Sequence, residues 1–218
     1  MNTDDLANYG TVLSYAVPSQ DNEITFTDYG GFVLSVKGQK VVTDITANDG
    51  TWTFLCAAWK SRLGLWAIFV NGQLIDSGNR LAENEVLEGE GVLVLGQEQD
   101  SPGGHFSAAE AFRGQLTRFN MFSTFLSQSQ INEVMNSCIE MSGDLVSWSD
   151  FYPGIHGFAL VKDLWPCTGC PRLKAPNFGE VAAIISPATA SFLQPSPANN
   201  RQLASCQSIL FLILHEAF

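Results

Sequence analysis

The sequence lacks an apolar run long enough to cross a bilayer. Its longest one, Ile209 to Leu214, is far shorter than the roughly 20 residues that a membrane helix requires. Basic residues are also scarce, because 11 Lys and Arg stand against 22 Asp and Glu and give a formal net charge of −11. Phosphate backbones and anionic membranes repel such a chain, which argues against nucleic-acid binding. Carboxylates are the hard oxygen ligands that calcium prefers, so the same composition suits a calcium site.

The sequence also lacks a recognisable secretory signal and an even number of cysteines. The opening residues, MNTDDLANYG, lack the basic and then apolar pattern of a secretory signal. The five cysteines are an odd number, so at least one is unpaired within the chain. A hydrophobic fraction of 45% is nevertheless sufficient to fill a sizeable core, which excludes a disordered chain for most of the length.

The chain divides into two parts of different character. All five Trp lie in residues 1–170, which we expect to form one domain. Residues 171–218 contain five of the nine Pro and only five charged residues, and their apolar residues follow neither a strand nor a helix period. We therefore expect residues 171–218 to form an irregular, disordered tail.

Within the first part, short runs rich in Val, Phe, Trp, Tyr and Thr alternate with Gly, Asn and Asp, which indicates an all-β antiparallel sandwich. Asn71-Gly72, between LWAIFV and QLI, predicts a hairpin with a type I′ turn. One short helix is expected over QSQINEVMNSC, with Ser127 as N-cap and Gln130 completing a capping box. Its apolar face would carry Ile131, Val134, Met135 and Cys138.

Acidic side chains gather in the segment LGQEQDSPGGHFSAAEAF. If Gln97 ends a strand, a turn at Gly103-Gly104 would bring Ser107 and Glu110 beside Glu98 and Asp100. Carboxylates crowded in this way repel one another unless a divalent cation lies among them. A solvated acidic loop is equally compatible with the spacing. The Asx-rich turn Gln20–Glu23 could supply further oxygens from an early part of the chain.

Several segments together resemble the pentraxin family, in particular its neuronal branch and the pentraxin modules of adhesion-type receptors. They are SYAVPSQDNEI, DGTWTFLCAAW, GVLVLGQEQDSPGGHF, AFRGQLTRFNMF, LSQSQINEVMNSC and DLWP, and they span residues 9–170 in the family's order. The resemblance implies a two-sheet jelly roll of the legume-lectin and pentraxin type. It also implies two adjacent calcium ions on one face, through which ligands bind.

The resemblance carries a ligand set onto this chain. Asp21, Asn22, Glu98, the backbone carbonyl of Gln99, and Asp100 match ligands of the first calcium ion, and Glu98 and Asp100 would bridge to the second. At the second ion the family has an acidic residue where this chain has Ser107, and a Gln where it has Glu110. We therefore expect one intact site and a weaker second one, with Glu110 as a candidate ligand.

The cysteines are interpreted in the same way. The resemblance implies a disulfide between Cys138 and Cys170. It also implies that the family's first strands, and the cysteine partner of Cys56, are missing here, as in the carboxy-terminal portion of a longer protein. Cys167 and Cys206 stay unassigned. Cys167 to Cys170 also forms a CxxC pattern, but no second CxxC and no His pair accompany it, which disfavours zinc or redox chemistry.

The expected function is a calcium-dependent, lectin-like binding module of a secreted or cell-surface protein. Its ligand would be a small molecule, a glycan or phosphate group, or a protein partner held through calcium. The alternative is an interaction or oligomerisation domain in which calcium only stabilises a loop. The family resemblance also implies a homo-oligomer, commonly a pentamer. An enzyme is not expected: some glucanases of similar fold use an E-x-D-x-x-E strand, and Gly103 stands where its last acid is needed.

Overall fold

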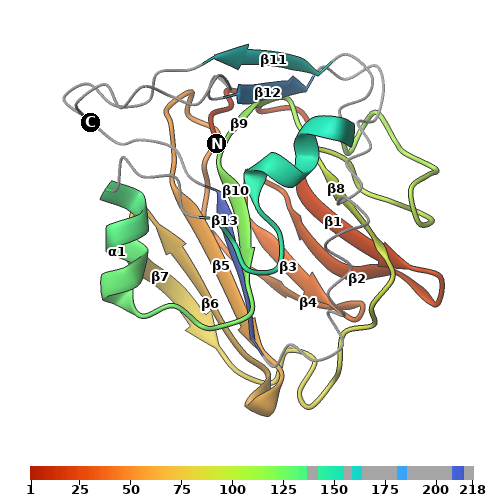
Figure 1. Ribbon diagram of the computed structural model, residues 1–218, viewed down its shortest axis with the longest axis vertical. Coiled ribbons are helices and arrows are strands. Elements are labelled where there is room, and N and C mark those ends of the chain that lie inside the picture. The colour runs from red at the N-terminus through yellow and green to blue at the C-terminus, as the bar shows by residue number, and fades with distance from the viewer. Residues whose placement is uncertain (137–141, 155–158, 164–180, 186–207, 214–218) are drawn as a thin grey trace.

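The computed structural model describes residues 1–136, 142–154, 159–163, 181–185 and 208–213. Two five-stranded antiparallel sheets face each other, and a three-stranded sheet lies across one end (Figure 1). The first sheet has the order β4 (Gln39–Val42), β3 (Val33–Val36), β2 (Gln20–Thr27), β1 (Thr11–Val17), β8 (Val92–Leu95). The second has the order β10 (Phe119–Phe122), β13 (Ser208–Ile213), β5 (Leu55–Lys60), β6 (Leu65–Val70), β7 (Gln73–Gly78).

The remaining elements close the ends and one outer face. The small sheet has the order β11 (Leu160–Asp163), β12 (Val181–Ile185), β9 (Gly114–Leu116). Helix α1 (Gln128–Asn136) lies against the outer side of the second sheet (Figure 1), and two short 3-10 helices are η1 (Arg62–Gly64) and η2 (Trp148–Gly154). The predicted all-β sandwich with one short α-helix is confirmed over the described residues. None of the helices they contain has the length and hydropathy to cross a membrane.

Strand β5 explains how the second sheet is buried on both faces. Its residues Leu55, Ala57 and Trp59 belong to the main core between the sheets. The alternating Cys56 and Ala58 belong to a second cluster that includes Ile131 and Val134 of α1. Because successive side chains of a strand point to opposite faces, a strand covered on both sides is apolar throughout, which is why LCAAW shows no polar alternation.

Two local predictions are confirmed in detail. Asn71 and Gly72 have φ angles of 50° and 76°, as a type I′ turn requires, and they connect β6 to β7 at the pair Val70–Gln73. At the start of α1, the Gln130 N–H donates to Ser127 Oγ over 3.3 Å, and Gln130 Oε1 accepts from the Ser127 N–H over 2.9 Å. This is the reciprocal capping box. Cys138, expected on the same helix, lies outside the described residues.

The region expected to be an irregular tail contains two strands. β12 pairs with β9 and β11, and β13 lies between β5 and β10, with pairs from Ser208–Lys60 to Ile213–Leu55 along β5. These two segments are strands in the structure, and the division of the chain at residue 170 stays a prediction. A central strand is paired on both sides and needs no polar alternation, so the absence of a period did not exclude a strand. Elsewhere in residues 171–218 the prediction lies outside the described residues.

Candidate metal centre

The segment after β8 folds back onto the first sheet. Gly96 has a φ of 87°, and its amide donates to the Val12 carbonyl over 3.1 Å. The buried side chain of Gln99 then holds the segment in place: its Nε2 donates to Ser14 O and Val92 O, each over 3.0 Å, and to Ser14 Oγ over 3.3 Å. This amide is therefore committed to the sheet. Of the Gln99 oxygens, the backbone carbonyl is the one suited to a ligand role, as the family resemblance implies.

The predicted turn at Gly103-Gly104 is present. Gly103 has a φ of 72°, its amide donates to Gln99 Oε1 over 2.7 Å, and the Gly104 amide donates to the Ser101 carbonyl over 2.9 Å. A second turn follows at Ser107. Its Oγ accepts from the Ala109 amide over 3.3 Å, and its carbonyl accepts from the Glu110 amide over 3.1 Å. These turns reverse the chain direction between Asp100 and Glu110.

Glu110 is fixed at the edge of the first sheet, because its carbonyl accepts from the Thr11 amide over 2.8 Å. Asp21 and Asn22 lie near the start of β2. The Asn22 amide donates to Gln20 Oε1 over 3.3 Å, and the Asn22 side-chain amide donates to Asp21 Oδ1 over 3.0 Å. The two stretches are separated in sequence, and both are positioned by the same sheet.

Glu98 lies within electrostatic reach of the other acidic candidates. Glu98 is 9% exposed, and burial together with the charges of Glu110, Asp100 and Asp21 raises its pKa to about 7. A hydrogen bond with Asn22 opposes that increase. The other four candidate side chains therefore all influence Glu98, three through their charge and Asn22 through a hydrogen bond. Their role as metal ligands stays a prediction.

The candidate ligand atoms are of the kind that calcium prefers, although they do not form a complete coordination sphere in this structure. Within the part of the chain that the structure describes, no three His, Cys, Asp or Glu side chains are close enough together to surround a metal ion. The candidates are carboxylate and amide oxygens, which calcium prefers over nitrogen or sulfur. Next to Glu98, the buried Gln97 Oε1 has no hydrogen-bond partner among the described residues. The chemistry of these donors therefore fits calcium, and their role as its ligands stays a prediction.

The cysteine predictions concern a different part of the molecule. Cys56 is buried with no disulfide partner among the described residues, and burial raises the pKa of its thiol. It lies in the cluster beneath α1, where it acts as a small apolar side chain. Cys138, Cys167, Cys170 and Cys206 all lie outside the described residues, so the proposed Cys138–Cys170 disulfide stays a prediction.

Comparison with known proteins gives a consistent result. The Pentaxin family model matches residues 1–163. The rat Sushi, von Willebrand factor type A, EGF and pentraxin domain-containing protein 1 is 38% identical over 179 residues, which are 80% of this chain and 5% of that protein. Human neuronal pentraxin-2 is 35% identical over 163 residues, 74% of this chain and 37% of that protein. The chain thus spans well under half the length of these relatives.

A solved structure supports the same fold. The heptameric SAP-like pentraxin from Limulus polyphemus superposes with a TM-score of 0.56, over 67% of this chain and 72% of that one. Its sequence identity is 23%, so the likeness concerns the fold alone. The architecture is accordingly the two-sheet jelly roll that the resemblance implies.

Proposed function

Since this chain belongs to the pentraxin family, we propose that it is a calcium-dependent ligand-binding module with lectin-like recognition. One observation supports this most directly. Glu98 is nearly buried, and its pKa is raised to about 7 by burial and by three other carboxylates, one of them from the distant β2. An arrangement of this kind is costly for an empty surface loop, and a divalent cation would relieve it.

The proposed first ion is held by Asp21, Asn22, Glu98, the Gln99 carbonyl and Asp100. A second ion would share Glu98 and Asp100 and take Glu110. We propose that it binds more weakly, because the Ser107 hydroxyl carries no charge and already accepts the Ala109 amide. Bound calcium supplies a positive centre with coordination positions that a ligand's own oxygens can fill.

The ligand class follows from that chemistry. Oxygen-rich groups such as a phosphate, the hydroxyls of a glycan or a carboxylate of a protein partner can complete the coordination sphere. By family membership we further propose a secreted or cell-surface location and a homo-oligomeric assembly, for which a pentamer is the leading candidate. The Limulus relative is described as heptameric, so ring size is itself a quantity to measure.

A second candidate is an interaction domain in which calcium only stiffens the loop. The Gln99 side chain favours it, because its bonds to Ser14, Val92 and Gly103 already anchor the segment without a metal. Catalysis is disfavoured. Gly103 takes the position of the acid that a glucanase-like pattern needs, and its positive φ places it in a turn.

Calcium titration calorimetry tests the proposal. The variant Glu98→Ala/Asp100→Ala should lose calcium binding, and calcium-dependent retention on phosphate- or glycan-coated beads should vanish with it. The matched control, Glu83→Ala/Glu85→Ala, removes the same charge from exposed positions in the loop between β7 and β8 and should behave as wild type. Wild-type titration by the double variant would refute the site. Calcium binding without retention of any ligand by the wild type would favour the stiffening role.

A further inference from the structure

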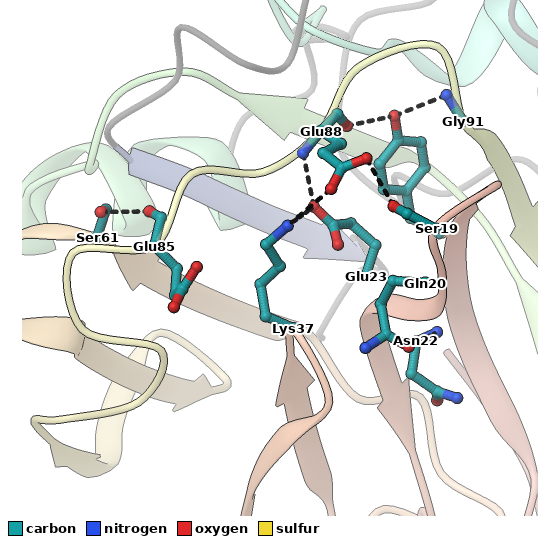
Figure 2. Close-up of polar contacts among 10 residues, drawn as sticks. Ser19, Gln20, Asn22, Glu23, Lys37, Ser61, Glu85, Glu88 and Gly91 are labelled. Atoms are coloured by element: carbon teal, nitrogen blue, oxygen red, sulfur yellow. Dashed lines mark hydrogen bonds and ion pairs between the residues drawn. The ribbon is translucent and has the colours of Figure 1, made fainter.

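A buried carboxylate, Glu23, comes immediately after the Asp21-Asn22 pair. The Glu23 side chain is 0% exposed. Its Oε1 accepts from the Glu88 amide over 2.6 Å and lies 3.3 Å from Lys37 Nζ. Its Oε2 is buried with no hydrogen-bond partner within the described residues. A buried carboxylate is tolerable only when it is paired, so Lys37 fixes Glu23 in this position (Figure 2).

Lys37 holds the same stretch through its main chain. Lys37 and Gly38 have φ angles of 52° and 72° and form the two-residue turn between β3 and β4. The Lys37 amide donates to the Glu23 carbonyl over 2.9 Å, and the Gly38 amide donates to the Asn22 carbonyl over 3.1 Å. One turn therefore fixes the backbone of both Asn22 and Glu23, and the Lys37 side chain adds the ion pair.

Glu88 connects this turn to two other segments. One carboxylate oxygen lies 3.3 Å from Lys37 Nζ, and the other accepts from Ser19 Oγ in the β1–β2 turn over 2.6 Å. The Glu88 carbonyl accepts from the Tyr15 hydroxyl over 2.9 Å, and that hydroxyl accepts from the Gly91 amide over 3.0 Å. Figure 2 shows these contacts meeting around Glu88. Because Gly91 leads directly into β8, the network fixes the start of β2, which carries Asp21 and Asn22, and the start of β8, the strand that precedes Glu98 and Asp100.

We propose that the Lys37–Glu23–Glu88 network is the positioning element of the cation site, acting on Asp21 and Asn22 without touching the metal. The inference rests on the proposed function. By holding the backbone of Asn22 rigid, the network reduces the conformational entropy that would otherwise be lost when the ion orders its ligands. Hydrogen-bonded partners that orient metal ligands typically contribute about 10- to 100-fold to metal affinity, and we expect about tenfold here.

The sign of the effect separates positioning from plain electrostatics. Lys37→Met removes a positive charge close to the site. If the network acted only through long-range electrostatics, the loss of this repulsion would tighten calcium binding. Loss of positioning would weaken it. Lys40→Met removes the same charge from an exposed position of the same hairpin, and we expect unchanged or slightly tighter binding. Lys37→Arg keeps the charge and should retain most of the affinity.

Calcium titration calorimetry of the full chain is the test, with a thermal melt of each variant. Lys37→Met leaves Glu23 buried and unpaired, so the double variant Glu23→Gln/Lys37→Met provides a version without that penalty. Both should bind calcium about tenfold more weakly than wild type. In the double variant the Gly38 amide should also exchange its hydrogen faster, because its bond to Asn22 loosens.

The outcomes separate the two proposals. A folded double variant with wild-type calcium affinity would overturn the positioning role and leave the calcium site in place. A wild-type chain that binds no calcium would overturn both. Tighter binding by Lys37→Met and Lys40→Met alike would assign the network a purely electrostatic influence.

Discussion

Lowering the pH from 8 to 6 should weaken calcium binding about tenfold through one residue. Glu98 must be ionised to bind a cation, and its pKa is raised from the ordinary 4.5 to about 7. Its ionised fraction therefore falls from about nine-tenths at pH 8 to about one-tenth at pH 6. A carboxyl group with an ordinary pKa stays ionised throughout this window, so Glu98 accounts for nearly the whole change.

Isothermal titration with calcium at pH 8, 7 and 6 measures the effect. At pH 7 binding should also release a fraction of a proton, which makes the observed enthalpy depend on the ionisation enthalpy of the buffer. Glu98→Gln is the control, and its weaker binding should be independent of pH between 8 and 6. A dissociation constant that stays the same from pH 8 to pH 6 in the wild type would show that Glu98 does not coordinate the ion.

The raised pKa of Glu98 also predicts how the stability of the calcium-free protein varies with pH. An acid whose pKa is raised by folding favours the protonated native state, so its contribution to stability is present below its unfolded pKa and is lost as pH rises towards 7. The calcium-free protein should therefore melt at a higher temperature at pH 5.5 than at pH 8. Saturating calcium should reduce or reverse that difference, because the ion stabilises the ionised form.

Three further predictions concern the scaffold. Gln99→Ala should lower the free energy of unfolding, measured by urea denaturation, by about 2 kcal/mol, because it removes the bonds to Ser14 and leaves buried groups unsatisfied. A change in unfolding free energy no larger than that of a substitution at an exposed position would contradict the anchoring role. Leu210→Pro in β13 should cost about 3 kcal/mol or more, since a central strand loses a ladder bond, and an unchanged melting temperature would argue against a structural role for β13. Ser127→Ala should cost about 1 kcal/mol by removing the cap that pairs with Gln130, and circular dichroism during thermal melting would reveal it.

Local patterns were predictable from the sequence because each depends on residues close together in the chain. The Asn71-Gly72 hairpin and the Ser127–Gln130 capping box follow from backbone preferences that operate within a few positions. The convergence of Asp21 and Asn22 with Glu98 was not derivable from local spacing. It followed from the family resemblance. In the structure the charge of Asp21 raises the pKa of Glu98 and a hydrogen bond with Asn22 lowers it, and their sharing of one metal ion stays a prediction.

Two features escaped prediction for physical reasons. The burial of Glu23 depends on Lys37 in the next hairpin and on Glu88 from a loop 65 residues away, so the sequence alone shows only another acid in a polar turn. A slightly stronger signal was present in Lys37-Gly38, a two-residue turn between β-prone runs. β13 was missed because a strand paired on both sides needs no alternation, which made its apolar run uninformative.

The loop between β7 and β8 divides into an exposed half, where the Glu85 carbonyl accepts from Ser61 Oγ, and a half that Glu88 ties to the first sheet. Residues 83 to 86 are exposed, whereas Leu87 is buried and Glu88 is tied to the sheet. Extra residues inserted between Glu85 and Val86 would therefore lengthen a surface excursion at a small closure cost and leave the register of β8 intact. That stretch offers a place to attach a fluorophore or an affinity tag without disturbing the carboxylates that follow β8.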